Sequence, residues 1–144
     1  MTVRLWLVVL VALPACKGSF VQNSPRTAIL SGVFVGLEEG TDVGVPFQDI
    51  SIQFTLSESG DSVTGTWEGL GVGIFRGEID RTMGTNVTFT MDQSAPCAGT
   101  FTGTAEARVG TTFSGDQTVG ISGTYAGTHC NGDIASTFFV QLSN

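Results

Sequence analysis

The chain has 144 residues, and its six lysines and arginines against thirteen aspartates and glutamates give a formal net charge of −7 at pH 7. This length fits one domain that can bury a core of its own. The acidic balance disfavours nucleic acids and anionic lipid headgroups as partners, because such a surface repels both.

The first sixteen residues have the pattern of an export signal. Residues 1–4 carry one positive charge, Arg4, and residues 5–13 form an unbroken apolar run. This run is far shorter than the ~20 residues of a membrane-spanning helix. It leads directly into Leu13-Pro14-Ala15-Cys16. We therefore predict that residues 1–15 are a signal peptide that is removed from the mature protein.

The segment that ends in Cys16 resembles the lipobox of bacterial lipoproteins, in which an aliphatic residue and two mostly small residues precede a cysteine. The resemblance implies cleavage before Cys16, a diacylglycerol thioether on its sulfur and acylation of the new amino terminus. Lys17 stands where the family's inner-membrane retention signal has aspartate. The resemblance thus implies a lipid-anchored envelope protein, on the outer membrane if the cell has one. The alternative is an ordinary secretory signal followed by a chance cysteine.

Loss of the signal peptide removes Arg4 and leaves an acidic chain whose first residues, 16–26, are mostly polar and lack periodicity. We expect them to form a lipidated tether that can reach up to ~33 Å, followed by one domain over residues 27–144. The two remaining cysteines, Cys97 and Cys130, are expected to form a disulfide in an oxidising compartment. A metal site at this pair is disfavoured because the chain has a single histidine.

From residue 27 onward the sequence predicts strands and no helices, because apolar residues alternate with polar ones and glycine and threonine are frequent. Residues 48–57 show this best, with Ile50, Ile52, Phe54 and Leu56 alternating with polar side chains. The first strand is apolar on both faces, so its inward side stays undecided, and residues 109–117 either extend the sixth strand or form a wider connection. The predicted strands are 27–38, 48–57, 62–69, 72–80, 86–92, 99–108, 118–127 and 134–142.

A five-residue pattern, glycine-x-aromatic-x-glycine, occurs five times in these strands. Alternate residues of a strand share one face, so each copy places a ring between two glycines. Glycines in strands mark bends and close approaches, so the repeated pattern predicts a strongly curved sheet. The central rings are Phe34, Trp67, Phe75, Phe101 and Tyr125.

About eight antiparallel strands with short connections predict an up-and-down β-barrel, because closure removes exposed edges. A two-sheet β-sandwich is the alternative. Cys97 precedes the sixth strand and Cys130 follows the seventh, so in a meander both lie at the same end of one strand pair. The strand number and Gly65-Thr66-Trp67 weakly resemble avidin and lipocalin-like barrels.

The sequence contains few candidates for catalytic or metal-binding residues. His129 is predicted to be an exposed loop residue beside Cys130, and Glu38, Glu39 and Asp42 a solvated acidic loop without the spacing of a calcium site. We therefore expect no catalytic residues, no metal and no cofactor.

The predicted inner face is aromatic, and no inward polar group that could orient a ligand is apparent. A filled core is favoured over an apolar cavity for this reason. We accordingly expect a non-enzymatic envelope lipoprotein with a structural or partner-binding role, the partner being an envelope protein. The alternative is a carrier of a small apolar ligand, with Trp67, Phe75, Phe101 and Tyr125 as wall residues.

Overall fold

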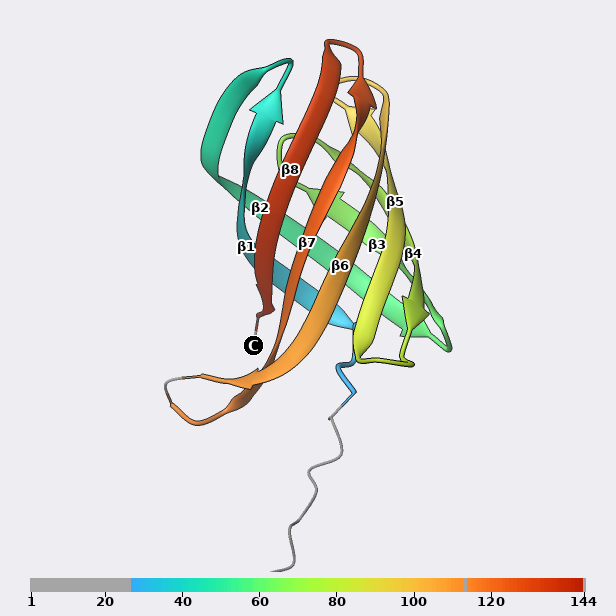
Figure 1. The fold of residues 1–144 in the computed structure, drawn as a ribbon, viewed down its shortest axis with the longest axis vertical. Helices are drawn as coiled ribbons and strands as arrows, with labels where there is room; N and C mark the ends of the chain where they lie inside the picture. The colour runs from blue at the N-terminus through green and yellow to red at the C-terminus, as the bar shows by residue number, and fades with distance from the viewer. Residues whose placement is uncertain (1–26, 113, 144) are drawn as a thin grey trace, which may run out of the picture.

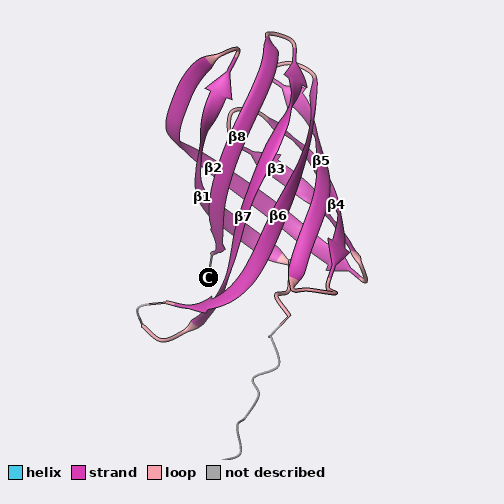
Figure 2. Ribbon diagram, in the orientation of Figure 1, coloured by secondary structure: helices cyan, strands magenta, loops and turns pink. Residues whose placement is uncertain are grey.

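The computed structural model describes residues 27–112 and 114–143. The predicted signal peptide (1–15), the tether (16–26) and the lipidation site Cys16 lie outside the described residues. The described part is a closed barrel of eight antiparallel strands in chain order (Figure 1, Figure 2). The strands are β1 (Gly32–Asp42), β2 (Val45–Ser59), β3 (Ser62–Glu68), β4 (Val72–Asp80), β5 (Thr85–Ala95), β6 (Gly99–Thr111), β7 (Gln117–His129) and β8 (Gly132–Leu142).

This architecture confirms the predicted up-and-down barrel and excludes the sandwich. All eight predicted strands are present, and residues 109–111 extend β6. Strand β1 continues to Asp42, so the prediction of a solvated acidic loop after the first strand is wrong. The reason is that β1 has partners on both sides, β2 and β8, up to that residue. Across residues 27–112 and 114–143, no helix is long and apolar enough to cross a membrane.

The two ends of the barrel differ in what they carry (Figure 1). The upper end carries the connections β1–β2, β3–β4, β5–β6 and β7–β8. The lower end carries the other three connections, and the chain both enters and leaves there. All features near Asp42, Cys97 and His129 therefore belong to the upper end.

All five rings of the repeated pattern face the interior and are at least 95% buried: Phe34, Trp67, Phe75, Phe101 and Tyr125. The structure also settles the facing of β1. Phe34 is fully buried, whereas its neighbours Val33 and Val35 are exposed on the outer face.

The register places four of these rings directly opposite a glycine of a neighbouring strand, whereas Phe34 lies opposite Phe54 and Leu142. Gly103 of β6, for example, lies opposite Phe89 of β5 and Tyr125 of β7. A Cβ atom on Gly103 would collide with the backbone oxygen of Thr124 and with the Phe89 ring. The glycines therefore create the space into which rings from neighbouring strands extend.

The lower end is closed by residues 27–31, which precede β1. Ala28 and Leu30 are both 1% exposed. The Leu30 N–H donates to Glu58 Oε2 at 2.8 Å, and Glu58 pairs with Arg81 at 2.7 Å. Arg81 in turn donates to the Ala28 carbonyl oxygen at 3.5 Å. An apolar plug and a half-buried ion pair thus seal this end.

The lower half of the interior is filled. A cavity bordered by Leu30, Phe54 and Phe138 has a volume of about 10 Å³. That is about the space of one water molecule.

Substitution of Gly103 by alanine should destabilise the barrel by about 2–3 kcal/mol, because the new Cβ atom overpacks the contact with Thr124 and Phe89. Gly110→Ala, in the same strand, is the matched control. No atom lies within 4 Å of its Cβ position, so this change should be neutral or slightly stabilising. Urea unfolding measures both, and equal stability of the two variants would contradict the prediction.

Candidate functional site

The upper half of the interior contains a buried polar cluster of Glu38 on β1, Tyr125 on β7 and Ser136 on β8. Glu38 is 1% exposed. The Tyr125 hydroxyl donates to Glu38 Oε2 at 2.6 Å, and the Ser136 hydroxyl donates to the same atom at 3.2 Å. The prediction that no polar group faces the interior is therefore wrong. The strand alternation itself explains this, because Glu38 shares a face with Phe34 once β1 extends past it.

A short connection between β3 and β4, Gly69-Leu70-Gly71, lies over this cluster. The Leu70 N–H donates to Glu38 Oε1 at 3.1 Å, and the Leu70 side chain packs against the core. A Cβ atom on Gly69 would lie 2.5 Å from Glu38 Oε1, so glycine is needed for this approach. The connection thus supplies one of the three hydrogen bonds to the carboxyl group.

Burial raises the pKa of Glu38 above its ordinary value, although the hydrogen bonds from Tyr125, Leu70 and Ser136 oppose this. Burial and the Glu38 carboxylate also raise the pKa of Tyr125. Tyr125 therefore remains a protonated hydrogen-bond donor to Glu38 at all physiological pH values.

Three of the four predicted ligand-wall residues lie beside this cluster. Ring centroids are 6.0 Å apart for Trp67 and Phe101, and 5.6 Å apart for Phe101 and Tyr125. Phe75 instead stacks on Phe89, with their ring centroids 4.9 Å apart. The buried Trp67 Nε1 atom has no hydrogen-bond partner among the described residues.

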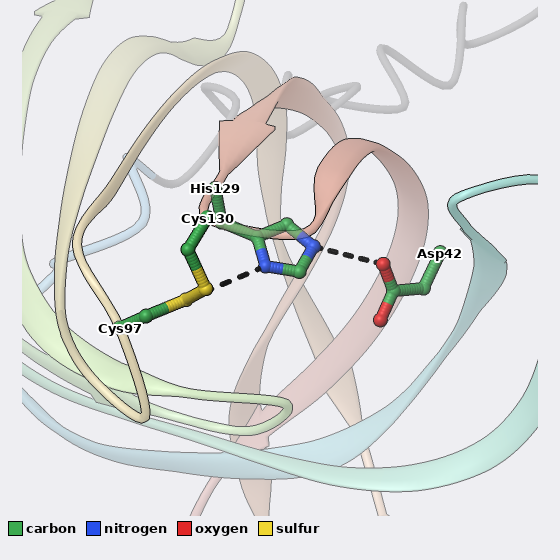
Figure 3. The surroundings of a disulfide bond; sticks show 4 residues. All are labelled: Asp42, Cys97, His129 and Cys130. Carbon is green, nitrogen blue, oxygen red and sulfur yellow. Dashed lines mark hydrogen bonds and ion pairs between the residues drawn. A yellow bond between two sulfur atoms is a disulfide. The ribbon is translucent and has the colours of Figure 1, made fainter.

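A second group at the upper end surrounds the predicted disulfide, Cys97–Cys130, which is confirmed with a Cα–Cα distance of 5.9 Å (Figure 3). The prediction that His129 is exposed is wrong, because its side chain is 7% exposed. His129 belongs to β7 and has the same inward parity as Tyr125. Its Nε2 lies 2.8 Å from Asp42 Oδ1, and its Nδ1 lies 3.8 Å from Cys97 Sγ.

The outer face of the barrel carries a shallow groove of about 830 Å³. It crosses the upper parts of β1, β2, β6, β7 and β8. Its lining includes Glu39, Thr41, Gln48, Thr102, Thr124 and Thr137, and no lysine or arginine. The surface is therefore neutral to acidic and rich in hydroxyl groups.

Sequence reasoning missed Glu38, Ser136 and the buried position of His129. The predicted strand ended at residue 127. Continuing its alternation by two residues, beyond the inward positions Tyr125 and Gly127, would have placed His129 inside. Ser136 has the parity of Phe138 and Val140 within the predicted strand 134–142, so alternation alone would have placed it inside. Glu38 required the facing of β1, which its pairing with β2 and β8 fixes.

Comparison with known proteins returned no matching family model, curated protein or solved structure. The fold and the contacts of the described residues are therefore the basis for any functional proposal.

The raised pKa of Glu38 predicts a specific pH dependence of stability. Between pH 4.5 and the folded-state pKa, the folded protein binds more protons than the unfolded chain, so its unfolding free energy should fall as pH rises through this window. Glu38→Gln should remove this slope in urea-unfolding measurements.

The matched control is Glu39→Gln, which removes the adjacent carboxylate on the outer face. This variant should retain the pH dependence of the parent. The same slope in the Glu38→Gln variant would show that the buried carboxyl group does not cause it.

Proposed function

We propose that the protein is a lipid-anchored binding protein of a bacterial cell envelope that holds its partner against the outside of the barrel and catalyses no reaction. The observation that carries this proposal is the filled interior. The cavity of about 10 Å³ beneath Phe54 and Phe138 is far smaller than the ~300–1,000 Å³ of small-molecule sites. A lower interior packed with its own side chains, below the hydrogen-bonded cluster at Glu38, leaves the outer surface for recognition.

The sequence at Cys16 supports the anchor. Two or three acyl chains on this residue would bind a membrane firmly, because each buried methylene contributes ~0.8 kcal/mol. The described chain begins at the lower end of the barrel. A tether attached there leaves the upper end and the outer groove free to meet a partner.

The outer groove supports a polar polypeptide partner from the envelope. Thr104, Thr124 and Thr137 lie directly opposite one another on β6, β7 and β8, so their hydroxyl groups form a row across three strands. Glu39 continues this row on β1. Hydroxyl and carboxylate oxygens without a neighbouring cation suit a segment that presents amide donors or positive charge.

The alternative is a carrier of a small apolar ligand. The unpaired Trp67 Nε1 and the nearby carboxyl group of Glu38 favour it, since ligand sites combine aromatic walls with a few polar groups. Such a ligand would require the connection over residues 69–71 to move away from Glu38. Quenching of Trp67 fluorescence during titration with a fatty acid, together with a raised melting temperature, would favour the carrier.

The anchor predicts that a clickable palmitate analogue labels the protein in growing cells and that Cys16→Ala abolishes the label. The labelled protein should fractionate with membranes, and the variant should not. Cys97→Ala is the control, because this cysteine lies in the disulfide and should not affect labelling. Persistent labelling of Cys16→Ala would contradict a lipid anchor at this residue.

The groove predicts that a photoreactive phenylalanine analogue at Thr124 crosslinks the protein in intact cells to one envelope protein. The same analogue at Thr66, an exposed residue on the outer face of β3 and outside the groove, is the control. A crosslinked species of defined mass should form from Thr124 and not from Thr66. Identical patterns at both positions, or none at either, would contradict recognition through the groove.

A further inference from the structure

The disulfide at the upper end has a histidine and a carboxylate aligned behind it (Figure 3). Cys97 lies in the β5–β6 connection, His129 ends β7, Cys130 follows it, and Asp42 ends β1. Ligand atoms of Cys97, His129 and Cys130 all lie within 4.8 Å of one another. The His129 ring lies between the Asp42 carboxylate on one side and the Cys97 sulfur on the other.

The contact with Asp42 fixes which nitrogen of His129 faces the bridge. A carboxylate only accepts hydrogen bonds, so the His129 Nε2–H donates to Asp42 Oδ1 across 2.8 Å. Nδ1 is then directed at Cys97 Sγ, 3.8 Å away. A disulfide sulfur carries no proton for Nδ1 to accept. A Cys97 thiol, formed on reduction, would have one.

The two cysteines differ in how exposed they are. Cys130 is exposed and Cys97 is half-buried. Attack by an incoming thiolate is therefore expected at Cys130, the more exposed residue, which makes Cys97 the leaving group. This group departs beside the His129 ring, and a thiolate next to a protonated imidazole is a better leaving group than one without such a partner.

The strands do not depend on the bridge to stay together. β6 and β7 are paired along their full length, from Gly99 opposite His129 to Thr111 opposite Gln117. The bridge lies just beyond the upper end of this ladder, so it can open while the ladder persists. Gly99 also leaves room for His129, because a Cβ atom there would lie 2.8 Å from the His129 Cβ.

From these contacts we infer that Cys97–Cys130 is a redox-active disulfide that exchanges with an external dithiol, with His129, oriented by Asp42, assisting the departure of Cys97. This inference goes beyond the proposed binding function and does not rest on it. The partner class is a dithiol, either a small molecule or a CxxC-type protein.

The exchange balances in two steps. One thiol of the dithiol gives up its proton to solvent and attacks the Cys130 sulfur, the bridge breaks, and Cys97 leaves as a thiolate. The imidazolium form of His129, which carries a proton on each nitrogen, donates its Nδ1 proton to this thiolate and regains a proton from solvent. The second thiol of the dithiol then attacks its own mixed-disulfide sulfur and releases Cys130 as a thiolate, which takes up a proton. The dithiol loses two electrons and two protons, and the bridge gains both.

The test measures the rate at which dithiothreitol reduces the bridge at neutral pH. The parent is the full chain carrying Cys16→Ser, in which Cys97 and Cys130 are the remaining cysteines. Samples are quenched with iodoacetamide and analysed by mass. His129→Phe keeps a ring against Phe101 and removes both nitrogens, and it should slow reduction by about tenfold. Asp42→Asn should slow it by a smaller factor.

Asp133→Asn is the matched control, because it removes an exposed carboxylate from the same end without contacting His129. It should reduce as fast as the parent. Equal rates for His129→Phe and the parent would overturn the inference.

Low concentrations of urea separate exchange in the folded barrel from exchange after unfolding. If the rate of reduction rises with urea in proportion to the unfolded fraction, the bridge reacts only in unfolded protein and the inference fails. Should His129→Phe not fold, Asp42→Asn decides the outcome, because it keeps the ring and the size of the acidic residue.

Discussion

The barrel depends on the pairing of a ring on one strand with a glycine on the next. Trp67 lies opposite Gly73, Phe89 opposite Gly103, and Phe101 opposite Gly127. At each of these pairs the residue without a side chain leaves room for the ring, whereas Phe54 lies opposite two other rings, Phe34 and Trp67. This arrangement fills the strongly curved barrel together with aliphatic side chains such as Leu30, Ile52 and Leu56. Because rings occupy the space beside the glycines, the interior cavity is small although the protein is rich in glycine.

Much of this arrangement could be predicted because it repeats. Alternation along each strand identified eight strands and the inward rings, and the positions of Cys97 and Cys130 within a meander predicted their bridge. The facing of β1 could not be predicted, since both Phe34 and its neighbours are apolar and only pairing with β2 and β8 distinguishes them. The polar cluster at Glu38 was missed for a related reason. A charged residue in a sequence suggests solvent, and its burial is acceptable only because three donors from distant strands and connections reach it.

The two ends of the barrel are closed by different physical means. The lower end uses apolar side chains of the N-terminal segment and the pair of Glu58 and Arg81. The upper end uses hydrogen-bonded polar groups, including Glu38, Tyr125 and His129. Apolar burial is nondirectional, whereas the polar closure depends on the geometry and protonation of its donors and acceptors. The disulfide and the buried carboxyl group of Glu38 both belong to the end farther from the entering chain.

The pairing of β1 with β8 has a consequence for the order in which the barrel can assemble. The other strand pairs join neighbours in the chain, whereas Phe34 pairs with Leu142, near the opposite terminus. That pair closes the longest loop and so carries the largest chain-entropy cost of the fold. A chain that emerges from its N-terminus presents β1 first and β8 last. One edge of β1, flanked by the exposed side chains of Val35 and Leu37, therefore stays unpaired until β8 has been synthesised.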